Sequence, residues 1–233
     1  MKKLLFTAAV SSACALSAAA PAAAFDFDGS TGTGTVLKGR GKIQYVPGVA
    51  GQALKMGDNT LSIPCPANVN PQEGSLSLWV KPVNWDQNKE EFVTFLFNLN
   101  PKKNGRLMLY KYRKSTGLGL VFWFGDPDSK NRIILSNPKA VFKQDQWMHL
   151  AVTWSKKTLA VKCFINGKKV RETKCEPELF YDTFGSFVLN EVPFRPNDRT
   201  LESAYDQLRL YPAPLSEDEV AKIYADHAKT IGK

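Results

Sequence analysis

The sequence predicts an all-β fold in which two antiparallel sheets stack as a jelly-roll sandwich, followed by a short C-terminal helix. Two observations lead to this prediction. Short segments of alternating apolar and polar residues recur along the chain, separated by glycine, proline and asparagine turns. A strand about every ten residues with turn chemistry between is typical of a sandwich or jelly roll. Convincing helical periodicity occurs only in residues 214–227.

The first 24 residues have the pattern of a secretory signal. A charged start with Lys2 and Lys3 precedes an apolar run over 4–13, about ten residues, whereas a membrane-spanning helix needs about 20. Three alanines at 22–24 supply the small-residue cleavage pattern. We therefore expect cleavage after Ala24, a single domain over residues 25–233, and a secreted or periplasmic product.

The first half of that domain contains several strand signals. Residues 31–35 are rich in glycine and threonine and predict a loop. Residues 47–54 combine a Pro-Gly turn with a short extended piece that leads into a strand. In 74–81, Leu76, Leu78 and Val80 alternate with polar residues and Trp79, which predicts a strand with one apolar face. Further strands are predicted over 60–63, 92–97, 107–112, 119–124, 132–135, 184–190 and 205–211.

Residues 147–170 (WMHLAVTWSKKTLAVKCFINGKKV) predict three consecutive strands. The first alternates, placing Met148, Leu150, Val152 and Trp154 on one face. The second places a further apolar set on one face, and Asn166-Gly167 follows it. This dipeptide accepts the two positive φ angles of a type I′ turn, so a tight hairpin is expected there.

The C-terminal segment carries helix signals. Ser216 and Glu219 have the spacing of a capping box. Acidic residues in the first turn complement the positive end of the helix dipole. Val220, Ile223 and Tyr224 recur at helical spacing, so the helix is expected to pack on the outside of the sandwich.

Charge and cysteine content limit the partners. Without Lys2 and Lys3, 29 of the 31 basic residues remain against 22 acidic ones, a net charge near +7. Such a surface favours acidic partners or serves only solubility; nucleic acid is not expected for an exported protein. Cys65, Cys163 and Cys175 follow the signal, and one disulfide is expected outside the cytosol. Cys163–Cys175 and Cys65–Cys175 both remain open, because the hairpin register would place Cys163 opposite Val170.

Four ordered segments resemble the laminin-G-like jelly rolls of the concanavalin A-like lectin/glucanase superfamily. They span nearly the whole chain after the signal, although the basic stretch 89–113 departs from the family pattern. The segments are 27–29 (FDG) with 47–54 (PGVAGQAL), 75–82 (SLSLWVKP), 147–153 (WMHLAVT) with 165–168 (INGK), and 206–216 (DQLRLYPAPLS). The resemblance implies a concave sheet whose face or rim binds glycans or protein partners, in some members through calcium. A shared fold does not by itself specify function.

Aromatic and basic side chains supply the candidate ligand contacts. Aromatic rings offer flat apolar faces on which sugars stack, and cations pair with uronate or sulfate groups. The same residues also have structural interpretations, as core for the aromatic residues and as a solvated face for the basic ones. Trp79 and Trp123 are favoured because their strand faces carry fewer aliphatic residues. The aromatic candidates are Trp79, Tyr110, Tyr112, Trp123 and Trp147, and the basic ones are Lys81, Arg106, Lys111, Arg113 and Lys114.

Calcium is the candidate cofactor, because turn carboxylates are its preferred ligands. The competing interpretation is that these aspartates cap turns; Lys130 stands where another oxygen ligand would help, and Asp206 is expected to bond backbone. The candidates are Asp26, Asp28, Asp126, Asp128 and Asp206.

Catalysis is not expected. A retaining glycoside hydrolase needs two carboxylates about 5 Å apart, and the sequence contains no E-x-D-x-x-E run. His149 is interpreted as a packed or hydrogen-bonded residue instead of a lyase base. The leading hypothesis is a non-catalytic carbohydrate-binding module, with acidic polysaccharide among its candidate ligands. A protein-interaction or envelope-structural module is the alternative, and a divergent glycan-cleaving enzyme is a third.

Overall fold

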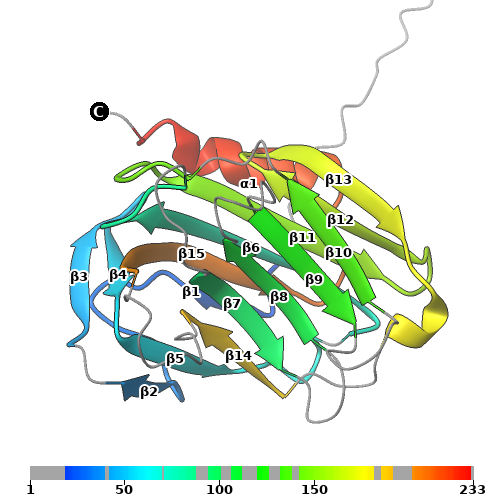
Figure 1. Cartoon of the computed structure of the whole chain (residues 1–233), viewed down its shortest axis with the longest axis horizontal. Helices are drawn as coiled ribbons and strands as arrows, with labels where there is room; N and C mark the ends of the chain where they lie inside the picture. The colour runs from blue at the N-terminus through cyan, green and yellow to red at the C-terminus, as the bar shows by residue number, and fades with distance from the viewer. Residues whose placement is uncertain are drawn as a thin grey trace, which may run out of the picture.

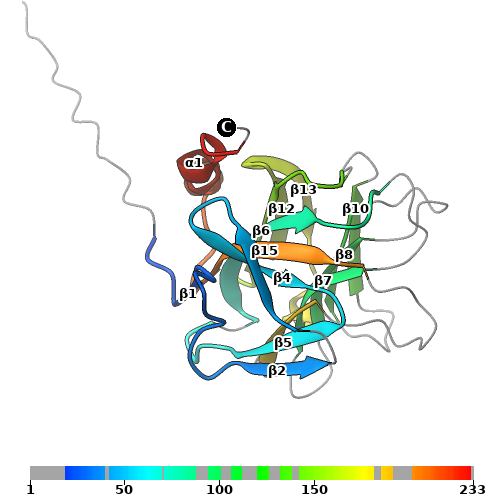
Figure 2. The same cartoon turned by 90° about the vertical axis from the view of Figure 1, so that its left-hand side faces the viewer.

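The computed structural model shows two antiparallel sheets stacked face to face, with one helix on the outside (Figure 1). Figure 2 shows the two layers and the helix from the side. For β7, β9, β10 and Arg106 only the backbone is described. The structure describes residues 19–39, 42–69, 71–87, 94–100, 106–111, 120–125, 132–137, 142–180, 185–190 and 201–231.

Sheet A contains the central strands of residues 147–170 and the last strand of the chain. Every strand pair in it is antiparallel. The path across it runs β13 (Lys168–Lys174), β12 (Ala160–Ile165), β11 (Met148–Ser155), β6 (Glu73–Pro82), β15 (Ser203–Tyr211), β4 (Gln52–Met56) and β3 (Gln44–Pro47), with β1 (Ala23–Phe25) beside β15.

Sheet B faces sheet A across the core. Its path runs β10 (Arg132–Asn137), β9 (Leu120–Gly125), β8 (Arg106–Lys111), β7 (Thr94–Asn100), β14 (Ser186–Leu189), β5 (Asn59–Pro64) and β2 (Val36–Gly39). A 3₁₀ turn, Pro177–Leu179, follows β13, and helix α1 spans Glu217–Ala228. The predicted all-β, two-sheet sandwich with a C-terminal helix is therefore confirmed.

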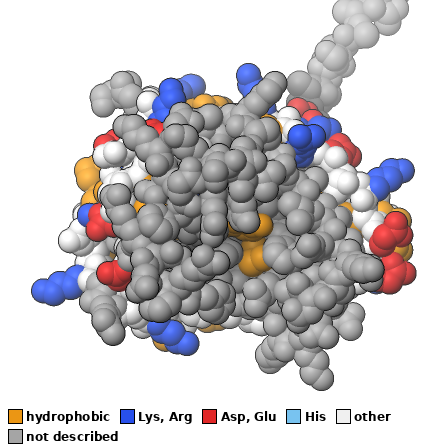
Figure 3. Space-filling model, in the orientation of Figure 1, with side chains coloured by type: hydrophobic (Ala, Val, Ile, Leu, Met, Phe, Trp, Pro, Cys, Tyr) orange, Lys and Arg blue, Asp and Glu red, His pale blue; other side chains and the backbone are white. Residues whose placement is uncertain are grey.

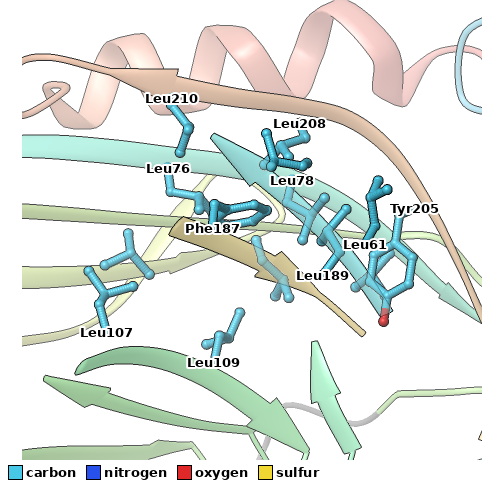
Figure 4. Packing of buried hydrophobic residues seen from close by; sticks show 14 of the residues in the cluster. Leu61, Leu76, Leu78, Leu107, Leu109, Phe187, Leu189, Tyr205, Leu208 and Leu210 are labelled. Carbon is cyan, nitrogen blue, oxygen red and sulfur yellow. The ribbon is translucent and has the colours of Figure 1, made fainter. Parts of the chain in front are cut away.

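The core fills the space between the sheets. Leu76 and Leu78 of β6 meet Leu107 and Leu109 of β8 across it, and Phe187 of β14 lies between the layers (Figure 4). All five side chains are at most 1% exposed. Because successive strand residues point to opposite faces, the alternation in 74–81 correctly predicted that Leu76 and Leu78 share one face.

The hairpin after β12 forms as expected, with one change of register. Asn166 and Gly167 have φ angles of 48° and 74°, which is the type I′ requirement. A bulge after Cys163 sets this residue opposite Arg171. The prediction that Cys163 faces Val170 is therefore wrong by one residue, because a bulge inserts an extra residue into one strand.

Helix α1 lies on the outer face of sheet A, as expected (Figures 1 and 2). The capping box is complete: Ser216 Oγ accepts from the Glu219 N–H, and the Glu219 carboxylate accepts from the Ser216 N–H. Val220 is fully buried in a second apolar cluster between helix and sheet, which also contains Ala151, Phe164, Tyr211 and Leu215.

The N-terminal strand β1 was not predicted, because it is built from Ala-Ala-Phe and lies across the expected cleavage point. The N–H of Ala22 donates to the carbonyl of Leu210 at 2.7 Å, and β1 continues this pairing along β15. The signal peptide and cleavage after Ala24 stay predictions. Within the described part of the chain, no helix has the length and apolar character to cross a membrane.

The predicted disulfide is not formed: Cys65, Cys163 and Cys175 are free thiols in the structure. The Cys175 N–H bonds to the Leu159 carbonyl, whereas Cys163 pairs with Arg171, which lies four residues before Cys175 in the chain. At about 3.3 Å per residue this offset is well beyond the 7 Å between Cα atoms that a disulfide spans. Burial raises the pKa of the Cys65 thiol to about 11 and that of Cys175 to about 12.

Candidate functional site

Asp206 organises the loop between β3 and β4. Its buried carboxylate accepts hydrogen bonds from the backbone N–H groups of Val49 at 2.7 Å and Ala50 at 3.2 Å, and from its own neighbour Gln207 at 2.7 Å. Burial raises the pKa of Asp206 to about 6, although the three backbone donors oppose the shift. The predicted role of Asp206 as a backbone-bonding residue is confirmed.

The two glycines of this loop allow the carboxylates to approach. A side chain on Gly48 would collide with the Asp206 carboxylate, and one on Gly51 would collide with Asp28. Gly51 also has φ of +61°, a conformation that glycine adopts without strain. The two glycines of the Pro-Gly-x-x-Gly segment therefore allow the loop to pack closely against Asp206 and Asp28.

The aspartates predicted as calcium ligands have partners within the fold. Asp28 accepts from the Gln52 N–H at 2.5 Å, and Asp26 forms an ion pair with Arg209. Among the described residues, no cluster of three His, Cys, Asp or Glu side chains could hold a metal. Calcium binding by Asp26, Asp28 and Asp206 stays a prediction.

Trp79, the favoured sugar platform, lies beneath helix α1. Its side chain is 1% exposed, and its ring stacks on Tyr224 with centroids 5.5 Å apart and planes 22° apart. The ring of His149 also packs against it, with centroids 5.1 Å apart, and lies 5.9 Å from the Tyr224 ring. The assignment of Trp79 to an open ligand surface is therefore wrong, because Tyr224 of the helix covers it.

His149 is a buried neutral residue, as expected. Its Nε2 lies 2.8 Å from the Ser77 hydroxyl, and its backbone N–H donates to the Asn166 side chain. Burial, with a smaller contribution from the charge of His227, lowers the pKa of His149 to about 3. Through its ring and its backbone N–H, His149 of β11 therefore bonds to β6 and to the hairpin beneath α1.

The folded state is expected to lose stability in acid through His149. Since its pKa is about 3 when folded and near 6.5 when unfolded, only the unfolded chain binds the proton between these values. The stability that the folded state gains from the neutral imidazole is complete above pH 6.5 and is lost as the pH falls toward 3. Urea unfolding at pH 7.5 and 4.5 is expected to show a smaller drop for His149→Gln than for the unmodified chain. An equal drop in both would contradict a buried neutral imidazole.

Two residues along β6 from Trp79, the outer face of sheet A carries a cross-strand row. Ala204 of β15 pairs with Lys55 of β4 and with Lys81 of β6, and the register of β6 with β11 continues from Lys81 to Trp147. The Lys81 ammonium lies 4.9 Å from the centre of the Trp147 ring. Both Lys81 and Trp147 are partly exposed, so this row unites two sequence-predicted candidates at the surface.

The two lysines of the row differ in charge pairing. Lys55 Nζ forms an ion pair with Glu202 at 2.9 Å, whereas Lys81 has no carboxylate partner among the described residues. An ammonium held against an indole ring, with no carboxylate partner in the described part of the chain, is suited to an incoming anion. We call Lys81 and Trp147 the indole–lysine pair.

The outer face of sheet B holds a second group of candidates. Tyr110 on this face is 8% exposed, and Lys111, which shares the opposite strand face with the core residues Leu107 and Leu109, is fully buried, so neither side chain is free at the surface. These two assignments are therefore wrong as open ligand contacts, although Figure 3 shows hydrophobic side chains at the centre of this face. Trp123 pairs in register with Met108, the neighbour of Tyr110 on its strand face, and Arg106 pairs with Gly125. The roles of Trp123 and Arg106 stay predictions.

The remaining candidates lie outside the described residues. They are Tyr112, Arg113, Lys114, Asp126 and Asp128.

Sequence reasoning missed Tyr224 as the ring that covers Trp79. Its helical spacing with Val220 indicated an inward face, but nothing in the sequence connects that face to β6. The Asp206 contact had a signal, since two glycines flank the loop whose amides it binds.

The fold defines a lectin-like β-sandwich built from two stacked antiparallel sheets. The chain belongs to the concanavalin A-like lectin/glucanases superfamily, whose family model matches residues 55–221. No curated protein sequence matches the chain.

Solved structures with the same fold include binding domains. Domain 4 of an extracellular arabinanase from Geobacillus stearothermophilus, solved with arabinotriose, is 24% identical with a TM-score of 0.66, over 89% of this chain and all of that domain. A structure of botulinum neurotoxin type C, which depends on two ganglioside molecules to get into cells, is 16% identical with a TM-score of 0.63. The match covers 85% of this chain and 48% of the toxin chain, so this chain spans about half the toxin's length.

A third structure is the binding domain of botulinum neurotoxin DC in complex with rat synaptotagmin II. It is 16% identical with a TM-score of 0.63, over 85% of this chain and 48% of that one. At these identities the likeness shows the shared fold.

Proposed function

We propose that this protein is an exported, non-catalytic carbohydrate-binding module that holds an acidic saccharide at the indole–lysine pair. The observation that carries the proposal is the partly exposed Trp147 ring beside the ammonium of Lys81, 4.9 Å from its centre and without a carboxylate partner among the residues that the structure describes.

The chemistry of the pair favours a sugar that carries a carboxylate or sulfate. The indole offers a flat apolar surface to the C–H face of a pyranose or furanose ring. The ammonium of Lys81 forms a charge-assisted hydrogen bond to the anionic group. The positive net charge of the chain, +9 with its first residues included, attracts such a polymer over a longer range.

The fold supports a glycan ligand by analogy. Its superfamily is named for lectins and glucanases, and the arabinanase domain and the toxin bind arabinotriose and gangliosides. Engagement of Asp26, Asp28 and Asp206 with Arg209 and backbone donors supports the non-catalytic part of the proposal, since these carboxylates are committed to the fold.

Lys81→Gln is expected to weaken binding of an acidic glycan by roughly tenfold, because a charged hydrogen bond contributes about 1.5–3 kcal/mol before solvent screening reduces it. The protein is screened on a glycan array at 50 mM and 300 mM salt, and the best ligand is titrated by calorimetry. Lys55→Gln is the matched control: it removes a lysine from the same row whose charge Glu202 already compensates, and should retain binding.

Trp147→Ala is included in the titration. Lys81→Gln and Trp147→Ala should both keep the unfolding midpoint of the unmodified protein within a few degrees. An equal loss of glycan binding in Lys55→Gln and Lys81→Gln would mean that only net charge matters, and would contradict a site at the indole–lysine pair. Loss of glycan binding in Trp123→Ala, with full binding in Lys81→Gln and Trp147→Ala, would indicate that the ligand binds at sheet B instead. Release of oligosaccharides from a bound polymer would contradict the non-catalytic assignment.

A further inference from the structure

The chain's own N-terminal segment occupies one edge of β15. The N–H of Ala22 donates to the Leu210 carbonyl at 2.7 Å, and β1 pairs Ala23 with Leu210 and Phe25 with Leu208. Further back, the N–H of Ala19 reaches the Glu219 carboxylate of α1 at 3.3 Å. Residues 19–25 therefore lead from the first turn of the helix to β15, with residues 23–25 forming strand β1.

The space beside this segment admits small side chains. Ala22 and Ala23 pack against the main core cluster, and Ala19 packs against the cluster beneath α1. A cavity of about 290 Å³ adjoins residues 19–21. Its other walls include Gln207, Arg209, Tyr211, Asp226 and His227. The segment thus lies in a groove with an apolar floor, polar sides and a backbone edge that offers hydrogen bonds.

Cleavage after Ala24 would remove most of this strand. Only Phe25, paired with Leu208, would remain of β1, and the Leu210 carbonyl would lose its donor. An unpaired strand edge is a template for another strand, because its backbone groups need partners.

We propose that the mature protein binds an extended peptide strand with small side chains, supplied by a partner protein, at the β15 edge vacated by residues 19–24. The occupant follows from the segment already seated there: alanine and proline fill the groove, and backbone N–H groups serve Leu210 and Glu219. This inference rests on cleavage after Ala24 and is independent of the glycan site, which lies on the β6 side of sheet A.

The test compares a chain with Phe25 as its first residue and a chain with Ala19 as its first residue. The probe is a synthetic peptide with the sequence of residues 19–24, titrated by calorimetry. The shorter chain is expected to bind it saturably, and the longer chain, whose groove is filled, at least tenfold more weakly. The same peptide with Ala22→Pro lacks the N–H that bonds Leu210 and should bind the shorter chain several-fold more weakly.

Folding of the shorter chain is followed by circular dichroism with and without peptide. If this chain is unfolded alone, the peptide is expected to restore the sheet signal, which supports the proposal equally. A folded shorter chain that ignores the peptide, or an unfolded one that the peptide does not restore, contradicts it. Equal binding of the peptide to both chains would also contradict the proposal. An intact mass of the exported protein that places its first residue before Ala24 would contradict it as well.

Discussion

Asp206→Ala is expected to lower the free energy of unfolding by about 2–5 kcal/mol. The substitution leaves the N–H groups of Val49 and Gln207 buried without an acceptor, at about 1–3 kcal/mol each, and removes the contact that holds the 47–51 loop. Urea unfolding followed by tryptophan fluorescence measures the change. Asp28→Ala is the control, because this exposed carboxylate accepts one bond, from Gln52, and about 1 kcal/mol is expected.

The same variant has a predicted pH dependence. Burial raises the pKa of Asp206 to about 6, above its ordinary 3.8, so the folded state binds a proton more readily than the unfolded state between these values. The stability from this protonation is complete below pH 3.8 and is lost as the pH rises through 6. The deficit of Asp206→Ala is therefore expected to be larger at pH 4.5 than at pH 7.5. A deficit that grows with pH would mean that the carboxylate is more stable folded than in water.

Trp79→Ala is expected to lower the free energy of unfolding by about 3–5 kcal/mol, the range for removing a fully buried large aromatic side chain. The substitution leaves a cavity between β6 and α1, where Tyr224 and His149 now pack against the indole. We expect loss of ordered packing of α1, seen as faster amide exchange in residues 220–227.

Trp147→Ala provides the contrast for this measurement. Its ring is partly exposed and contacts Lys81 at the surface, so a change within about 1 kcal/mol is expected, since surface substitutions have small effects. The two variants thus separate a tryptophan that builds the fold from one available to a ligand. Equal destabilisation by both, or a stable Trp79→Ala with impaired glycan binding, would reverse the assignment of the two residues.

Much of the architecture could be predicted because strand burial has a period of two. The alternation in 74–81 and 147–154 identified which side chains face the core, and Ser216 with Glu219 identified the start of α1. Asn166-Gly167 predicted the hairpin, but the bulge that shifts Cys163 to Arg171 could not be seen. A bulge depends on how two strands twist against each other, and no local residue pattern specified it.

The candidate site was predictable only as a set of residue types. Trp79 and Trp147 both looked like candidates for a sugar platform, and the choice between them depended on a helix some 140 residues away along the chain. Tyr224 of α1 covers Trp79, while the strand register brings Lys81 beside Trp147. Likewise, the sequence predicted that Asp206 bonds backbone, but only the fold identified the amides as those of the distant 47–51 loop.

The sequence by itself determined the two-layer β-sandwich, its hairpin and its capped helix, because these follow from interactions between residues close in the chain and from which faces must leave water. The tertiary structure decided which aromatic rings are covered, which carboxylates accept backbone hydrogen bonds and which lysine lies against an exposed indole ring. These properties depend on contacts between segments far apart in sequence, where burial and hydrogen bonding are settled only once the sheets and the helix have come together.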